Sequence, residues 1–358
     1  MSKNCKVEWI QSSATGRLRR LLPVLVAALL WTQLGAAPAS AHNVVVKMAT
    51  LVPEGSSWQL ILKQMAEQWK KASGGQVSVR LYAGGVAGDD PDVVRKMRLG
   101  TLNAGVLTAV GVGEIDKSVY ALGVPMMYRN YDEVYHVLDK LRPQLERIME
   151  DKGFVVLNWV DAGWVHFFTQ KPVETPEDLR QLKLFSWAGD PESVELWKRA
   201  GFHPVPLPST EISTALQTGL VNALGCPPQV AVITQYYNHA KNMTDLNWQL
   251  LLGATVINKS TWEQIPAAVR PALLEAAREA GRRLQDEVRH NGEKDVEAMR
   301  KRGLNVVTVD DQARAQWLRT AETFYPRIRG QIVPAEAFDA ARRFRDEYRD
   351  HGSASGQP

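Results

Sequence analysis

The segments that follow an apolar N-terminal stretch alternate between strand and helix patterns, and this alternation limits the chain to one broad fold class. Residues 44–49 (VVVKMA) are typical of a buried strand, and residues 58–72 carry apolar side chains at helical spacing. A Ser-Gly-Gly turn at 73–75 ends this helix, and residues 77–82 alternate like a second strand. A strand–helix–strand unit indicates a parallel sheet covered by helices, so we expect an α/β fold.

The N-terminus has the order of a secretory signal peptide. A basic stretch is followed by an apolar run at 21–30 and by residues 39–41 (ASA), which predicts cleavage before His42. A single membrane anchor is the alternative, but the run is shorter than the roughly 20 residues that a span needs. The paired arginines at 19–20 leave the twin-arginine route open beside general secretion, which is the default. We therefore expect a periplasmic protein.

The basic excess of the whole sequence lies in this N-terminal segment. Its cleavage removes five of the 43 Lys and Arg residues and one of the 39 Asp and Glu residues, which leaves 38 of each. A mature chain without net charge gives no electrostatic reason to expect binding to nucleic acid or to an anionic membrane. The mature chain keeps one cysteine, Cys226, so no internal disulfide can form and the core must stabilise the fold.

Strand and helix patterns alternate over the remaining chain as well. The mature chain has about 317 residues, which suggests two domains at roughly 150 residues each. Residues 267–299 are predicted to form a charged helix of some 45 Å, interrupted only at Gly281 and at Asn291-Gly292. A solvated structural helix is the favoured interpretation, and a brace that links both domains is the alternative. Further strand patterns lie at 106–110, 154–157 and 183–185, and further helix patterns at 89–99, 191–200 and 209–218.

Five short blocks follow one another in a fixed order. They are Ser73-Gly74-Gly75, Gly100-Thr101-Leu102-Asn103, Pro176-Glu177-Asp178-Leu179, Ala215-Leu216-Gln217-Thr218-Gly219, and Ile257-Asn258-Lys259-Ser260-Thr261-Trp262 before Pro266. Any one block is weak, but the five together resemble the solute-binding subunits of TRAP (tripartite ATP-independent periplasmic) transporters over residues 44–309. The resemblance implies two α/β lobes, connected by crossing strands and a long helix, that close on one small molecule.

Three polar positions of the family pattern are apolar or small in this chain. In most members of the resembled family an arginine follows a Leu-Lys-apolar sequence and binds the substrate carboxylate through two charge-assisted hydrogen bonds. Phe185 stands at that place. The strand before Lys171-Pro172 reads WVHFF at 164–168, and residues 221–227 (VNALGCP) lack the usual acidic and amide side chains. We therefore expect an atypical member without the carboxylate-binding arginine.

Phe185 argues against a carboxylate ligand on physical grounds. Burial of an ionised carboxylate without a paired charge costs several kcal/mol. Phe185 and Trp187 can instead remove apolar ligand surface from water, at about 25 cal/mol per Å². We expect a small apolar or uncharged organic solute, while the aromatic rings leave a sugar or a cation open. An organic acid or sugar acid held by non-standard polar residues is the alternative.

The expected ligand site combines side chains from both lobes. Trp164 and His166 share one face of their strand, and His166 is the best neutral polar candidate. Aromatic strand residues are also typical of a core, which is the favoured interpretation of Phe167 and Phe168. The expected ligand-binding residues are Phe185, Trp187, Trp164, His166 and Cys226 from the second lobe, Ser57, Trp58 and Thr108 from the first lobe, and Trp248 and Gln249 near a crossing strand.

The sequence shows no pattern typical of catalysis or metal binding. Cys226 precedes two prolines and has no neighbouring histidine or lysine to activate the thiol. The histidines lack the paired spacing of zinc sites, and residues 84–88 (GGVAG) lack the Lys-Ser/Thr ending of a phosphate-binding loop. Asp89-Asp90 is interpreted as a helix cap rather than an acid/base pair. We expect no enzymatic activity, no metal and no cofactor.

These patterns together predict a monomeric, two-lobed periplasmic binding protein that delivers its solute to the integral-membrane permease subunits of a TRAP transporter. A secreted enzyme on the same scaffold and a sensory protein that presents its ligand to a receptor are alternatives from other classes. The predicted division is a signal peptide at 1–41, a first lobe at 42–162 with 251–290, a second lobe at 163–250 with 291–345, and a disordered tail at 346–358.

Overall fold

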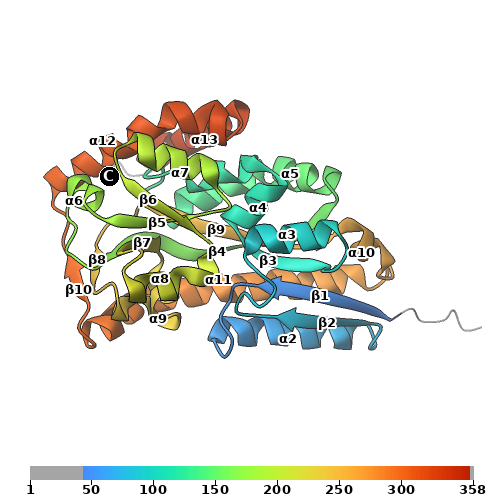
Figure 1. Cartoon of the computed structure of the whole chain (residues 1–358). Helices are drawn as coiled ribbons and strands as arrows, with labels where there is room; N and C mark the ends of the chain where they lie inside the picture. Colours follow the sequence, from blue (N-terminus) through green and yellow to red (C-terminus); the bar gives the residue numbers. More distant parts are fainter. Residues whose placement is uncertain (1–42, 355–358) are drawn as a thin grey trace, which may run out of the picture. The chain divides into compact units, whose positions relative to one another are not determined.

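The computed structural model describes residues 43–354 (Figure 1). The predicted signal peptide and its cleavage site lie outside these residues. Within the described part of the chain, no helix is both long and apolar enough to span a membrane.

One mixed sheet runs through the molecule in the order β2-β1-β3-β9-β4-β7-β5-β6. The strands β1, β2 and β3 are parallel, as are β5, β6 and β7, whereas β9 and β4 are antiparallel to their neighbours. This arrangement confirms the predicted α/β fold. The strands are β1 (Val44–Thr50), β2 (Val77–Tyr82), β3 (Ala104–Thr108), β4 (Phe154–Thr169), β5 (Lys183–Trp187), β6 (His203–Leu207), β7 (Ala223–Cys226) and β9 (Gln249–Asn258). In addition, β8 (Asn242–Thr244) pairs with β4, and β10 (Asn305–Val307) pairs with β8.

The strand β4 belongs to both halves of the sheet. Its first part, from Phe154 to Val165, pairs with β9, and its last part, from His166 to Thr169, pairs with β7. The pairing with β9 shifts register between Asp161 and Trp164, where Gly163 has a positive φ of 100°. Such an irregularity bends a strand at this place.

Helices cover both faces of the sheet (Figure 1). On one face, Met48 of β1 packs with Met65 and Trp69 of α2 and with Leu273 of α11. The other face carries α3, α4 and α5 beside the first lobe and α7 and α12 beside the second, with α13 packed against α5. The helices are α2 (Ser57–Ala72), α3 (Asp90–Arg98), α4 (Ala109–Ile115), α5 (Tyr131–Asp151), α6 (Pro176–Arg180), α7 (Pro191–Arg199), α8 (Ile212–Thr218), α9 (Pro228–Ile233), α10 (Lys259–Gln264), α11 (Arg270–Arg300), α12 (Asp311–Arg327) and α13 (Ala335–Ala354), with helical turns η1 (Lys117–Gly123), η2 (Ser209–Glu211), η3 (Tyr236–Asn238) and η4 (Ile328–Ile332).

The long helix α11 braces the fold on one face and exposes charged side chains, such as Glu275 and Arg282, on the other. It contacts α2 and β4 in the first lobe and α9 in the second, with Leu273, Leu284 and Val288 buried. Gly281 lies within this helix and does not interrupt it. A Cβ at this position would lie 3.1 Å from side-chain atoms of Asn158 on β4. The glycine therefore permits close packing of α11 on the crossing strand, and the contacts of α11 agree with the alternative prediction of a brace.

The C-terminal helix also corrects an expectation. α13 continues to Ala354, so the predicted disorder from residue 346 is wrong as far as residue 354. The Arg349 guanidinium pairs with the buried Glu133 carboxylate of α5 at 2.8 Å and donates to the Met127 carbonyl. Burial opposes ionisation of Glu133, but Arg349 and other donors outweigh it and hold the pKa below its usual value. The polar sequence of this segment therefore serves an ion pair that fastens α13 to α5.

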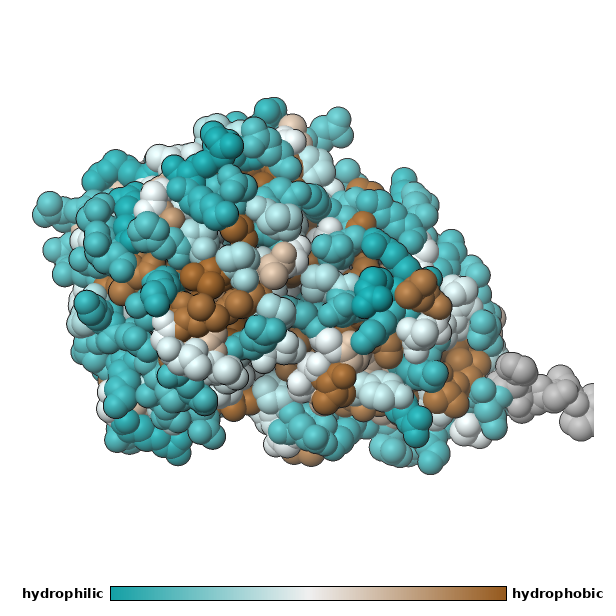
Figure 2. Space-filling model, in the orientation of Figure 1, coloured by the Kyte–Doolittle hydropathy of each residue, from teal (hydrophilic) through white to brown (hydrophobic). Residues whose placement is uncertain are grey.

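The strand β6 lies at one end of the sheet order and carries a row of prolines. The carbonyl of Leu207 accepts a bond from the Ala188 N–H, so Leu207 faces the β5 side. By strand alternation the main chain of Pro204 and Pro206 faces the opposite, open edge, where a proline offers no N–H. Figure 2 shows apolar residues over the strands of this lobe. Because of the prolines, this edge lacks two of the N–H donors that an added strand would need for pairing.

Candidate ligand-binding cavity

A cavity of about 560 Å³ lies between the two groups of strands. This volume falls within the range of roughly 300 to 1,000 Å³ that is typical of small-molecule sites. Its walls come from the segment after β1, the ends of β3 and β5, β7, and the crossing strands β4 and β9. The cavity therefore lies where the two lobes meet.

Aromatic side chains of β5 form one wall. The rings of Phe185 and Trp187 meet edge to face, with their centroids 5.8 Å apart. Phe185 is 8% exposed and packs in a cluster with Ile212, Cys226 and Tyr236, which also line the cavity. These groups present apolar surface to anything that enters.

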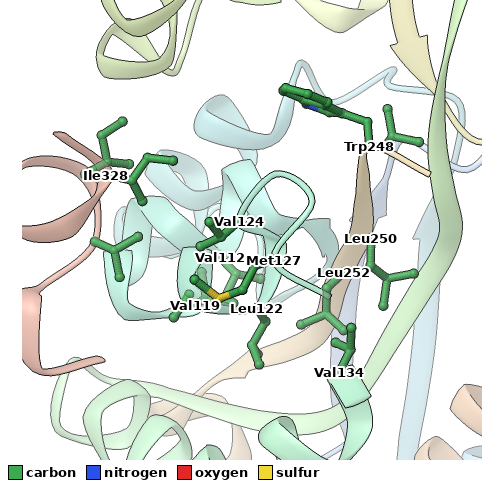
Figure 3. Packing of buried hydrophobic residues seen from close by; sticks show 14 of the residues in the cluster. Val112, Val119, Leu122, Val124, Met127, Val134, Trp248, Leu250, Leu252 and Ile328 are labelled. Atoms are coloured by element: carbon green, nitrogen blue, oxygen red, sulfur yellow. The ribbon is translucent and has the colours of Figure 1, made fainter. Parts of the chain in front are cut away.

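Residues of the main core form another part of the lining. Leu250 and Leu252 of β9 lie beside Val124 and Met127, which follow η1, and Ile328 approaches from η4 (Figure 3). Of these, all but Met127 also line the cavity. The wall belongs to a continuous packed core, so we expect it to keep its shape when a solute binds.

The charged residues at the cavity are all acidic. Glu54, Asp161 and Asp190 line it, and none of the described lining residues is a lysine, arginine or histidine. Burial raises the pKa of Asp190, against two hydrogen bonds donated by the main chain and hydroxyl of Ser193. Among the described lining residues, no positive side chain is available to an anion.

A guanidinium beside the lining binds a carboxylate of the protein itself. Arg289 of α11 lies 3.2 Å from Asp161, and its guanidinium covers the ring of Tyr131 at 4.4 Å. The Tyr135 hydroxyl donates to the same carboxylate. Burial raises the pKa of Asp161, although Arg289 and Tyr135 act to lower it. Arg289 is not among the residues that line the cavity.

Thr108 of the lining is held by a buried acid. Its N–H and hydroxyl both donate to Asp90 Oδ2, at 2.8 and 2.7 Å, and its own Oγ1 accepts the Val110 N–H at the start of α4. Burial raises the pKa of Asp90 to about 7 in spite of these bonds.

Seven of the ten predicted site residues line the cavity. They are Phe185, Trp187, Cys226, Trp58, Thr108, Trp248 and Gln249. Burial raises the pKa of the Cys226 thiol, which keeps it protonated and unreactive at neutral pH. No cluster of histidine, cysteine and carboxylate side chains suited to a metal ion occurs within residues 43–354.

Three predicted residues do not line the cavity. Trp164 and His166 share a strand face as expected, but Val165 and Phe167 on the other face of β4 line the cavity instead. Trp164 packs on Tyr131 with ring centroids 5.6 Å apart. His166 Nδ1 lies 3.2 Å from the Thr244 carbonyl, and burial lowers the pKa of this histidine, which favours the neutral form.

Ser57, the third of these residues, is exposed in the first turn of α2. Ser56 has the local role instead, because its Oγ accepts the Gln59 N–H and caps the helix. The prediction missed four further aromatic lining residues, none of which lies in a block of the family pattern: Tyr120, Trp197, Tyr236 and Phe324. Phe167 is both a core residue, at 1% exposure, and a lining residue.

Comparison with known proteins agrees with this arrangement. The model of the family described as bacterial extracellular solute-binding protein, family 7, matches residues 48–331. The C4-dicarboxylate-binding periplasmic protein DctP of Rhodobacter capsulatus is 27% identical over 307 residues, which cover 84% of this chain and 90% of that protein. The 2,3-diketo-L-gulonate-binding periplasmic protein YiaO of Escherichia coli is 25% identical over 256 residues, or 70% and 77% of the two chains.

A solved structure supports the same fold. The TRAP periplasmic solute-binding protein of Ralstonia eutropha H16, with bound (S)-2-acetolactate, superposes with a TM-score of 0.79 at 20% identity. The match covers 85% of this chain and 99% of that one, which confirms the two-lobed architecture. Proteins of this family bind small solutes outside the cytoplasm and work with membrane permease subunits. This chain belongs to the bacterial extracellular solute-binding proteins of family 7, the solute-binding proteins of TRAP transporters.

Proposed function

We propose that this protein binds a small apolar or uncharged organic solute and hands it to a TRAP-type permease without chemical change. The observation that carries the proposal is the lining of the cavity, in which Phe185 occupies the place expected for an arginine and the described charged groups are acidic. On this proposal the chain is an atypical member of its family, which lacks the carboxylate-binding arginine.

The energetics favour an uncharged solute. A carboxylate in this cavity would lose its hydration, which costs several kcal/mol, and would meet Glu54 and Asp190 rather than a cation. An apolar solute that buries about 200 Å² on Phe185 and Trp187 would gain around 5 kcal/mol before ordering costs. Uncharged groups on the solute can meet a neutral donor of the lining such as the amide of Gln249.

An organic acid is the second candidate, because the relatives named above are described as binding acids. The guanidinium of Arg289 reaches the lining through its pair with Asp161. An acid would have to displace Asp161 from this pair or rely on neutral donors alone. Neither arrangement offers the two-pronged contact that a free arginine makes.

The proposed contacts come from three parts of the molecule. Phe185, Trp187 and Cys226 face Trp58 and Thr108 across the cavity, with Trp248 and Gln249 beside the crossing strand β9. We place the boundary of the lobes at residues 162–163, as the sequence predicts. The shift in the register of β4 at this position supports the placement. The prolines of β6 favour a monomer. Solute binding would shift the protein towards the closed form by its differential affinity for that form.

Matched pairs of solutes test the proposal. Isothermal titration calorimetry would compare acids with the primary amides of the same carbon skeleton, on protein freed of bound solute. We expect amides to bind at least tenfold more tightly than their acids, about 1.4 kcal/mol. A consistent preference for the acids would refute the uncharged-solute proposal and favour the second candidate.

A further inference from the structure

One carboxylate of the first lobe accepts three hydrogen bonds from the second lobe. Asp89 Oδ2 accepts the indole N–H of Trp187 at 2.9 Å and the main-chain N–H of Ser209 at 2.7 Å. Its Oδ1 accepts the Ser209 hydroxyl at 2.7 Å and also the Asp90 N–H at the start of α3. Asp89 is 7% exposed, so these bonds are largely shielded from water. A helix cap alone would need only the bond from Asp90.

Direct packing of the two lobes surrounds these bonds. A Cβ at Gly189 of the second lobe would lie 2.4 Å from Pro91 of the first. A Cβ at Gly85 of the first lobe would lie 2.8 Å from Thr210 of the second. Lys117 and Glu192 add an ion pair across the same boundary. The lobes are thus in contact along one side of the cavity.

We propose that Asp89, Trp187 and Ser209 form a latch that keeps the lobes closed, with Asp89 as a positioning residue for the aromatic wall. The indole N–H of Trp187 is anchored by the carboxylate, and the same indole lines the cavity. Asp89 therefore sets the orientation of a ring that a solute would touch, and it joins the lobes without needing the solute. The latch proposal depends on the proposed function in one respect, namely that a solute binds between the lobes.

Asp89→Asn is the informative substitution. An asparagine has nearly the same shape, but one of its two terminal groups is an N–H₂ donor, which cannot accept from Trp187 or Ser209. The lost bonds are charge-assisted and therefore among the stronger kind. Asp92→Asn is the matched control, since Asp92 lies on α3, is exposed, and pairs with Arg95 of the same helix.

Single-molecule fluorescence energy transfer measures the latch without knowledge of the solute. Dyes on cysteines that replace the exposed Leu99 of the first lobe and Leu220 of the second report the distance between the lobes. Cys226 is buried and its thiol pKa is raised, so it stays unlabelled. The protein is first unfolded, dialysed and refolded, which removes any solute.

In the solute-free protein we expect Asp89→Asn to lower the closed-to-open ratio at least tenfold relative to the wild type, while Asp92→Asn leaves it unchanged. Ser209→Ala removes one bond and should give a smaller decrease, and it decides the question if Asp89→Asn fails to refold. A ratio that is unchanged in the latch variants would overturn the latch. Neither result bears on the choice between acids and amides.

Discussion

Phe185→Arg tests the account of the cavity by restoring the residue type that the family pattern expects. The phenyl ring is 8% exposed and packs on Trp187. Its removal from the wall costs about 1.5–3 kcal/mol of hydrophobic burial. The new guanidinium enters a wall without a dedicated partner, and an uncompensated buried charge costs about 3–5 kcal/mol. Water in the cavity hydrates the guanidinium and offsets part of these two costs. We therefore expect the free energy of unfolding to fall by about 3–5 kcal/mol.

Urea unfolding followed by circular dichroism measures this loss. Phe185→Leu is the control, because it keeps an apolar side chain and should cost only about 1–1.5 kcal/mol. In calorimetry, Phe185→Arg should bind small carboxylates at least tenfold more tightly than the wild type does, since the added guanidinium supplies the missing charge. A variant that is as stable as Phe185→Leu and gains no carboxylate affinity would refute the reasoning.

Two further substitutions probe the surroundings of the cavity. The pKa of Asp90 is raised from 3.8 to about 7, so between these pH values the folded protein holds a proton that the unfolded chain has released. The free energy of unfolding therefore falls as the pH rises from about 4 to about 7, by up to about 1.4 kcal/mol per pH unit. Asp90→Asn should flatten this loss in urea titrations at about pH 5 and about pH 7, and a slope equal to that of the wild type would contradict the assignment. Gly253→Ala would place a Cβ 2.2 Å from the Leu107 carbonyl oxygen and should destabilise the protein by about 3 kcal/mol. Gly292→Ala, with open space around it on α11, should stabilise by about 0.5–1 kcal/mol, and equal melting temperatures for the two alanine variants would argue against the clash.

The parts of the fold that depend on local signals could be predicted from the sequence. The strand–helix–strand start follows from the spacing of apolar residues, and Asp89 was recognised as a cap because carboxylates are common at that position. The bonds from Asp89 to Trp187 and Ser209 were not foreseen, since they join residues 98 and 120 positions apart. Local sequence patterns do not reveal contacts between residues so far apart in the sequence.

The errors have the same origin. Strand alternation puts Trp164 and His166 on one face, but it does not say which face of β4 meets the cavity. Gly281 led to the prediction of an interruption in α11. The close approach of Asn158, which explains the glycine, cannot be recognised from the local sequence. The polar segment after residue 345 suggested disorder because its partner, Glu133, lies more than 200 residues away in the sequence.

The identity of the solute that the protein carries tests the central claim most directly. Protein isolated under native conditions from the cell envelope would be examined by native mass spectrometry, and the released molecule identified after denaturation. The account predicts one uncharged organic molecule per chain, without a carboxylate. An organic acid bound in that ratio would contradict it.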